Sequence, residues 1–175
     1  MTLSGGEPLL QAKLTVSLLK RAKEEGLHTC METCGFADPS AVAEAAPLVD
    51  LFLFDYKESD PVRHKTYTGV DPAPILKNLQ LIDSLGCAVA LRCPIIPGYN
   101  DRPDHFEGIA RVASTLSHIT EITVEPYHAL GESKYQRLGR PYGPSGTNAP
   151  DRETVTAWIN EIQKHTTVPV FSAIG

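Results

Sequence analysis

The chain has 175 residues, of which 42% are hydrophobic, and its formal net charge is −5 at pH 7. These values predict one soluble globular domain over residues 1–175, and the scattered lysines and arginines argue against nucleic acid or an anionic membrane as the main partner. No apolar run approaches the roughly 18 residues of a membrane span, and residues 1–3 have neither the basic nor the apolar part of a signal peptide. We therefore expect a cytoplasmic protein.

Short β-like runs alternate with amphipathic helical runs along the chain. A first strand is expected to end at the turn Gly5-Gly6, and the helix after it ends at Gly26. That helix is predicted by the helical spacing of Leu9, Leu10, Leu14, Leu18 and Leu19. Further helices are expected over residues 39–46, 73–85, 103–116 and 151–165. Further strands are expected over residues 28–32, 51–57, 87–93, 121–127 and 168–172.

Three segments have distinctive features. The strand over residues 51–57 is apolar on both faces for most of its length, which is typical of a strand covered on both sides. Residues 58–72 are rich in Pro and Asp and carry the chain as a loop to the next helix. Residues 131–150 form a Gly- and Pro-rich stretch whose length indicates a lid or a partner-binding loop.

Six strands alternating with helices, without hairpin signals, predict an α/β fold of parallel βα units joined by right-handed crossovers. Such a sheet either closes toward a TIM-type barrel or stays open as a doubly wound sheet. In both cases functional residues gather at the carboxyl ends of the strands.

The expected strand ends carry polar groups or exposed backbone. These residues are Gly5, Gly6, Glu7, Glu32, Thr33, Asp55, Lys57, Arg92 and His128. Asp55 and Lys57 share one side of their strand, and Arg92 shares a side with small alanines that leave room. A pocket with acids, bases and bare backbone suits a zwitterion, whose ammonium would meet residues 5–7 and whose carboxylate would meet Lys57 or Arg92. Taken alone, each group is more often a local ion pair or a capping residue, but that explanation would have to hold at consecutive strand ends together, which favours a pocket.

The four cysteines do not predict a disulfide framework or a metal centre. Cys30 and Cys34 have a CxxxC spacing, but a CxxxCxxC iron–sulfur motif needs a third cysteine at position 37, which is Ala37. Together with Cys87 and Cys93, they are expected to be reduced thiols that act as small, mostly buried apolar residues.

A set of motifs occurs in the order and spacing of a known family. The motifs are Ser4-Gly5-Gly6-Glu7-Pro8, Glu32-Thr33-Cys34-Gly35, Asp55-Tyr56-Lys57, Arg92 before Ile95-Ile96-Pro97-Gly98-Tyr99-Asn100-Asp101, and Pro126-Tyr127-His128-Ala129-Leu130-Gly131. Over nearly its whole length the chain resembles the glycyl-radical-enzyme activating enzymes, of the pyruvate formate-lyase-activating type, in the radical S-adenosylmethionine (SAM) superfamily.

The resemblance implies a partial (β/α)6 TIM-like barrel that holds SAM against a [4Fe–4S] cluster. Reduction of the cluster, by a donor such as flavodoxin or ferredoxin, cleaves SAM. The resulting radical removes a hydrogen atom from a glycine of a partner enzyme such as pyruvate formate-lyase. Which glycyl radical enzyme is the partner is not determined by the sequence.

The resemblance also assigns roles to residues. Gly5, Gly6 and Glu7 would receive the methionyl amino group, and Lys57 its carboxylate. Asp55, Arg92 and His128 would contact SAM as well. A monovalent cation would be held by Glu32, Thr33 and Asp55, for which hard oxygen ligands are suited. Lys134 would face the substrate peptide.

One departure from the family bears on activity. The CxxxCxxC segment that precedes Gly-Gly-Glu-Pro in the family is not in this chain, so we expect a fragment, truncated at the N-terminus, that lacks the first βα unit and the cluster thiolates and is inactive alone. Its first strand would then be an exposed edge, which favours self-association or a poorly ordered N-terminus. In addition, Cys34 stands where relatives often have Asn, and Glu125 lies in an otherwise apolar strand without an assigned role.

Two other functions stay open. One is a Schiff-base lyase on a barrel, with Lys57 as nucleophile and Asp55 as its proton partner. The other is a non-catalytic module that binds SAM, or a partner protein through residues 131–150.

Overall fold

One six-stranded sheet organises the computed structural model, which describes residues 1–129, 139 and 146–173. Its strands are β1 (Thr2–Leu3), β2 (Cys30–Thr33), β3 (Leu51–Asp55), β4 (Val89–Ile95), β5 (Ile119–Pro126) and β6 (Val170–Ser172). The strands lie in sequence order, and every neighbouring pair is parallel. The expectation of parallel βα units is therefore confirmed.

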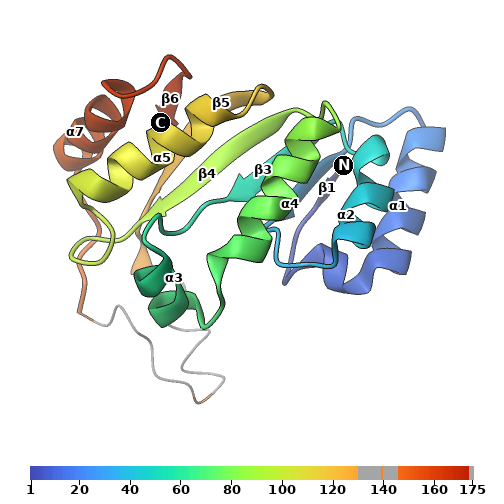
Figure 1. Ribbon diagram of the computed structural model, residues 1–175, viewed down its shortest axis with the longest axis horizontal. Helices are drawn as coiled ribbons and strands as arrows, with labels where there is room; N and C mark the ends of the chain where they lie inside the picture. The colour runs from blue at the N-terminus through green and yellow to red at the C-terminus, as the bar shows by residue number, and fades with distance from the viewer. Residues whose placement is uncertain (130–138, 140–145, 174–175) are drawn as a thin grey trace.

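The sequential strand order decides between the two expected architectures. A doubly wound sheet reverses its order at a switch point, which puts helices on both faces. An order that never reverses, with right-handed crossovers, puts the connecting helices on one face, as Figure 1 shows for α2, α4 and α5. Strands β1 and β6 are the two ends of the sheet, so the fold is a partial barrel, as expected.

The helices begin at recognisable signals. Their bounds are η1 (Pro8–Gln11), α1 (Ala12–Glu24), α2 (Pro39–Ala45), η2 (Ala46–Leu48), α3 (Pro61–Thr68), α4 (Pro72–Ser84), α5 (Pro103–Thr115) and α7 (Arg152–Gln163). Asp38, Asp60 and Asp71 each cap a helix whose first residue is proline, a position where the missing N–H costs nothing. Asp151 caps α7 by accepting a hydrogen bond from the Thr154 N–H, as the capping-box-like pattern indicated. Among the described residues, none of the helices has the length and apolarity to cross a membrane.

The loop expected over residues 58–72 contains helix α3, so that prediction is wrong. Only His64 of this helix is buried, and the helix therefore has no apolar stripe for periodicity to reveal. The remaining signals were its ends, where Asp60 precedes Pro61 and Gly69 closes the helix with φ +80°. A smaller correction concerns β4, which continues through Pro94 to Ile95 instead of ending at Cys93.

The leucines of the first helix do not share one buried face. Leu9 and Leu19 are in the core, whereas Leu10, Leu14 and Leu18 are 72%, 55% and 43% exposed. The exposed three lie four residues apart, on one side of the helix. This exposed leucine stripe belongs to α1 and its lead-in turn, which join β1 to β2.

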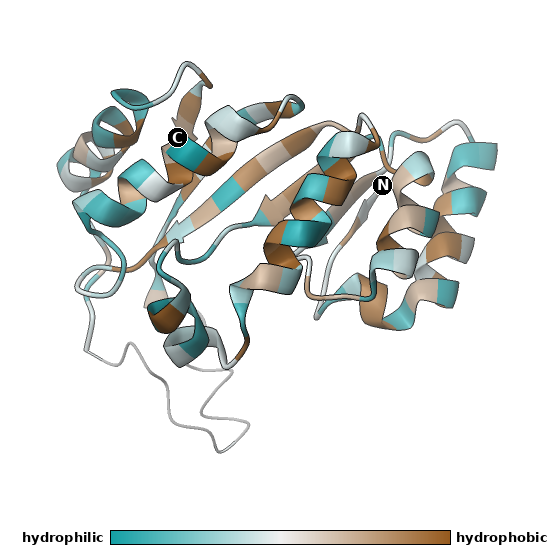
Figure 2. Ribbon diagram, viewed as in Figure 1, coloured by the Kyte–Doolittle hydropathy of each residue, from teal (hydrophilic) through white to brown (hydrophobic). Residues whose placement is uncertain are grey.

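Only one face of the sheet is covered by the described chain, so the expectation that β3 is covered on both sides is wrong. Phe52 and Phe54 are fully buried toward the helices, whereas Leu51, Leu53 and Asp55 alternate with them and stay half-exposed. The strands are nevertheless largely hydrophobic, as Figure 2 shows for β3 and β4. We call the side opposite the helices the open face.

The turn after β2 is fitted closely to the core. Gly35 has φ +73°, a conformation that L side chains rarely adopt. A Cβ atom there would lie 2.5 Å from the ring of Phe54. The backbone after Thr33 therefore passes directly over a core phenylalanine, which fixes where β2 ends.

Candidate functional site

Charged side chains from four strands and one strand-following loop meet on the open face. Arg92 of β4 contacts Glu32 of β2 through Nη1 at 2.7 Å and Glu125 of β5 through Nε at 2.9 Å. Its Nε also lies 3.9 Å from Oδ1 of Asp55, and Lys57 Nζ lies 3.0 Å from Oδ2 of Asp55. We call these five residues the strand-end cluster. It unites four of the predicted site residues and adds Glu125.

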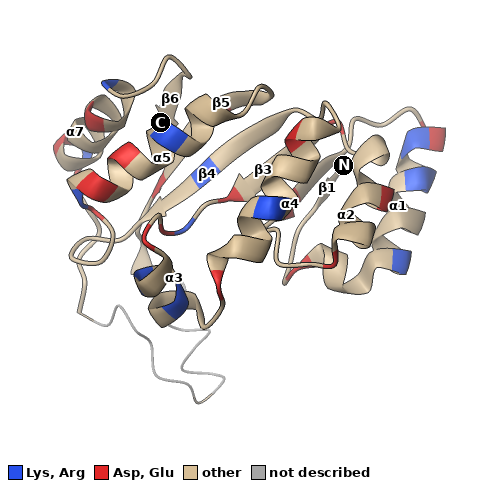
Figure 3. Ribbon diagram, viewed as in Figure 1, with Lys and Arg blue, Asp and Glu red and all other residues tan. Residues whose placement is uncertain are grey.

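Strand register explains this convergence. Asp55 pairs with Arg92, and Arg92 pairs with Thr123, two residues before Glu125 on the same face of β5. Figure 3 shows a basic segment within β4 and an acidic segment at the end of β3. With three carboxylates and two cations, the strand-end cluster has a formal net charge of −1. It therefore suits a ligand with an excess of positive charge.

Protonation states in the cluster follow from its contacts. Partial burial opposes ionisation of Glu32, but the hydrogen bond from the Ser4 hydroxyl and the charge of Arg92 prevail and lower the pKa of Glu32. Burial likewise opposes the charge on Arg92, but the hydrogen bond to Glu125 and the surrounding carboxylates raise the pKa of Arg92. Both groups are therefore charged at neutral pH.

The twin-glycine turn leaves its backbone open beside the cluster. Gly5 and Gly6 are exposed, and a Cβ atom added to either would meet nothing within 4 Å. The neighbouring Ser4 hydroxyl donates a 2.8 Å hydrogen bond to Oε2 of Glu32, which ties the turn to the cluster. A small ligand can thus lie against the glycine backbone and the charged groups together.

Glu7 holds the ends of β1 and β2 together. Its carboxylate accepts hydrogen bonds from the Thr33 hydroxyl at 2.8 Å, from the Cys34 N–H at 3.0 Å and from the Leu9 N–H at 3.2 Å. The Cys34 thiol is 3.2 Å from the same carboxylate, and burial, together with Glu7, raises the pKa of this thiol. Sequence reasoning missed this tethering role. The contact of Glu7 with an amino group stays a prediction.

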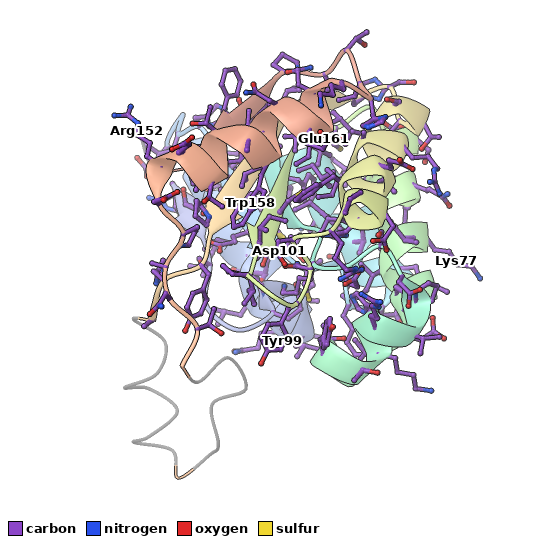
Figure 4. All side chains as sticks on the ribbon, turned by 90° about the vertical axis from the view of Figure 1, so that its left-hand side faces the viewer. Lys77, Tyr99, Asp101, Arg152, Trp158 and Glu161 are labelled. Carbon is purple, nitrogen blue, oxygen red and sulfur yellow. The ribbon has the colours of Figure 1, made fainter. Side chains whose placement is uncertain are left out.

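The loop after β4 holds the backbone of Lys57 through the side chain of Asn100. The buried side-chain amide of Asn100 donates to the carbonyl oxygens of Lys57 at 2.9 Å and Pro94 at 2.7 Å, and its Oδ1 accepts the Ile96 N–H at 2.7 Å. Figure 4 shows the neighbouring Tyr99 on this loop. The turn-forming composition of the loop indicated rigidity, but it did not single out Asn100.

A second buried group secures the segment after Lys57. Glu58 is 1% exposed and forms an ion pair with Arg102, with Nη2 3.0 Å from Oε1. The Ser59 N–H donates to Nδ1 of His105 at 3.0 Å, and the His105 ring stacks on Tyr56. Burial lowers the pKa of His105 to about 4, so the imidazole is neutral at pH 7. No sequence signal pointed to this group.

Three predicted site residues are not members of the strand-end cluster. His128 is exposed two residues after the last residue of β5, at the same end of the sheet as the strand-end cluster. Thr33 is buried and directs its hydroxyl to Glu7, so the cation site of Glu32, Thr33 and Asp55 stays a prediction. Lys134, like most of residues 131–150, lies outside the described residues.

The cysteines do not form a mount for an iron–sulfur cluster. All four are free, as expected, but only Cys93 is fully buried. Within the described ranges, which contain every cysteine, no three side chains of the types His, Cys, Asp or Glu are grouped to hold a metal ion. The residues present therefore do not fit a [4Fe–4S] cluster.

Comparison with known proteins gives consistent matches. The family model described as "Radical SAM superfamily" matches residues 1–113. The chain is 39% identical over 157 residues to the isethionate sulfite-lyase activating enzyme of Nitratidesulfovibrio vulgaris, covering 89% of this chain and 50% of that protein. It is 33% identical over 161 residues to the pyruvate formate-lyase-activating enzyme of Streptococcus mutans, covering 89% of this chain and 61% of that protein.

Among solved structures, a crystal structure of a domain of pyruvate-formate lyase-activating enzyme from Bacteroides vulgatus matches with a TM-score of 0.81 and 25% identity. The match covers 99% of this chain and 98% of that one. By contrast, the chain spans about half the length of the curated relatives it matches.

Proposed function

Because the chain belongs to the radical SAM superfamily, we propose that its twin-glycine turn and strand-end cluster bind SAM. The relatives are named as activating enzymes, so the family resemblance drawn from the motifs is confirmed. The observation that carries the proposal is the convergence of Glu32, Asp55, Lys57 and Arg92 beside an open glycine backbone.

The charges of the site complement those of SAM. SAM carries a sulfonium, an ammonium and a carboxylate, and thus a net charge of +1, against −1 for the strand-end cluster. The carbonyl groups of Gly5 and Gly6, with Glu7, receive the ammonium, and Lys57 receives the carboxylate. Asp55, Arg92 and the exposed His128 contact the remainder of the molecule. A monovalent cation shares the oxygen atoms of Glu32, Thr33 and Asp55.

When bound, SAM supplies the radical chemistry of the superfamily. The role of this chain is to bind and orient it. Asn100 and the Glu58–Arg102 pair hold the backbone directly after the Lys57 side chain, which preorganises the ammonium that receives the carboxylate. Since the cysteines present do not fit a [4Fe–4S] cluster, the part that these residues play is confined to SAM itself.

We further propose that the chain is part of an activating enzyme that generates a glycyl radical on a partner such as a pyruvate formate-lyase-like enzyme. A flavodoxin or ferredoxin donates the electron, and thiolates other than these four cysteines hold the cluster. The 175-residue chain alone is then inactive. Anaerobic reconstitution followed by iron and sulfide analysis should find no stoichiometric cluster, and finding one would contradict this assignment.

Calorimetry with SAM under anaerobic conditions tests the binding proposal. The wild-type chain should bind one SAM, and Lys57→Met should weaken binding about tenfold, as expected for loss of a charged hydrogen bond. Lys77→Met is the matched control, since Lys77 is exposed on α4 and points away from the molecule (Figure 4). Equal affinity of the Lys57→Met and Lys77→Met variants would contradict the assigned site.

The two alternative functions predict other results. A Schiff-base lysine attacks as a free amine, whereas Lys57 Nζ is engaged in a 3.0 Å ion pair with Oδ2 of Asp55. Borohydride should therefore not trap Lys57 with a carbonyl compound. A module that binds only a partner protein would give no heat with SAM but would bind a glycyl-radical peptide.

A further inference from the structure

We propose that Glu125 is a positioning residue of this site: it takes the Nε–H of Arg92 and so keeps one oxygen of Asp55 available to a ligand. The proposal rests on the proposed function insofar as that ligand is SAM. It assigns a role to the one carboxylate of the strand-end cluster that the motifs do not include.

The distances show how the Arg92 hydrogen bonds are divided. Its Nε lies 2.9 Å from Oε1 of Glu125, which is hydrogen-bond distance, but 3.9 Å from Oδ1 of Asp55, which is not. Its Nη1 is engaged with Glu32 at 2.7 Å. The other oxygen of Asp55, Oδ2, accepts from Lys57 at 3.0 Å. Oδ1 of Asp55 is therefore close to a positive charge without being hydrogen-bonded to it.

The sheet register explains why Glu125 is needed for this arrangement. Asp55 pairs directly with Arg92 across β3 and β4, so Asp55 is the natural acceptor for the Arg92 Nε–H. Glu125 stands opposite Pro94, two residues further along on the other side of Arg92. Without the Glu125 carboxylate, the half-buried Nε–H would lose its acceptor, and Asp55 is the nearest replacement.

Strand β5 also offers a matched control. Glu121 lies on the same face, four residues earlier, and pairs with Ala90, two residues before Arg92. Its Oε1 lies 3.4 Å from the Thr123 hydroxyl. Glu121→Leu therefore makes the same chemical change on the same strand and face, without removing a contact to Arg92.

NMR tests the positioning role without any ligand. The Arg92 Nε–H resonance, assigned by its loss in Arg92→Lys, should shift little on Asp55→Asn in the wild-type background. In the Glu125→Leu background the same Asp55→Asn change should shift it strongly, because Arg92 has then turned to Asp55. Equal shifts in both backgrounds would overturn the proposal. Glu125→Gln keeps an acceptor oxygen and provides a second variant, with an intermediate shift expected, should Glu125→Leu fail to fold.

Calorimetry with SAM then measures the consequence. Glu125→Leu should weaken binding about tenfold, Glu125→Gln less, and Glu121→Leu less than about twofold. In an Asp55→Asn background, Glu125→Leu should have no further effect, because Glu125 acts through Asp55. An undiminished effect there would overturn the inference. Failure of the wild-type chain to bind SAM would instead contradict the proposed function, and the NMR comparison would still decide the role of Glu125.

Discussion

The side-chain amide of Asn100 donates a 2.9 Å hydrogen bond to the carbonyl oxygen of Lys57. The loop after β4 therefore fixes the residue that follows β3, and a site built from neighbouring strands is braced by the connection between them. A residue outside the strand-end cluster thus fixes the backbone from which the Lys57 side chain extends.

Replacing Asn100 should destabilise the protein. Asn100→Ala leaves three backbone groups without their partner, those of Lys57, Pro94 and Ile96, and we expect a loss of about 3 kcal/mol in the free energy of unfolding. Asn100→Asp should lose more, because it turns a carboxylate oxygen toward two carbonyl oxygens. Urea denaturation measures both, with Asn160→Ala on the exposed side of α7 as control. Equal stability of Asn100→Ala and Asn160→Ala would refute the bracing role.

His105 should make stability depend on pH. Its pKa is lowered by burial from 6.5 to about 4 in the folded chain, so between these values the unfolded state binds more protons than the folded state. The contribution of His105 to the free energy of unfolding has its full value above about pH 6.5 and falls as the pH drops toward about 4. Urea denaturation across this range should show a steeper loss for wild type than for His105→Gln. The exposed His28→Gln variant should keep the wild-type slope, and identical slopes for all three proteins would contradict this role of His105.

Gly35 should tolerate no side chain. Gly35→Ala combines a positive φ with a Cβ atom 2.5 Å from the Phe54 ring, and we expect it to lower the free energy of unfolding by about 3 kcal/mol. Gly86→Ala is the control, because Gly86 has φ +77° but open space around its Cβ position. It should cost only about 1 kcal/mol, for backbone strain. A similar loss in both variants, measured by thermal or chemical unfolding, would show that contact with Phe54 is unimportant.

Self-association is expected at the β1 side of the molecule. The two-residue strand β1 is an end of the sheet, and the exposed leucine stripe of Leu10, Leu14 and Leu18 follows it in the chain. Light scattering should show a mass that rises with concentration, and Leu14→Glu should reduce it. Leu85→Glu, at an exposed leucine after α4, should not. A monodisperse wild-type monomer at all concentrations would rule this out.

Much of the fold could be predicted because its signals are local. Closing glycines and apolar runs marked most elements, and the absence of hairpin signals indicated parallel strands. Helix α3 escaped detection because it buries only His64 and so lacks periodicity. The leucines of η1 and α1 correctly predicted the helix, but helical spacing alone cannot say which of two adjacent leucines faces the sheet.

The candidate site, too, could be predicted only in part from the sequence. Asp55, Lys57 and Arg92 could be identified because parallel strands bring their carboxyl ends to one edge. The role of Glu125 could not be predicted, because its partner, Arg92, is 33 residues away in sequence. The same holds for Asn100 and His105, whose partners follow the end of β3.

From the sequence alone, side-chain alternation along each strand and the order of the motifs determined which polar residues end on the open face and which family the chain resembles. The tertiary structure decided which of those charges pair, that the sheet forms a partial barrel, and that Glu125 takes the Arg92 Nε–H while Asp55 does not. The physical reason is that a hydrogen bond is made or lost by a difference of about 1 Å between donor and acceptor, and the strand register that sets these distances is a property of the assembled sheet.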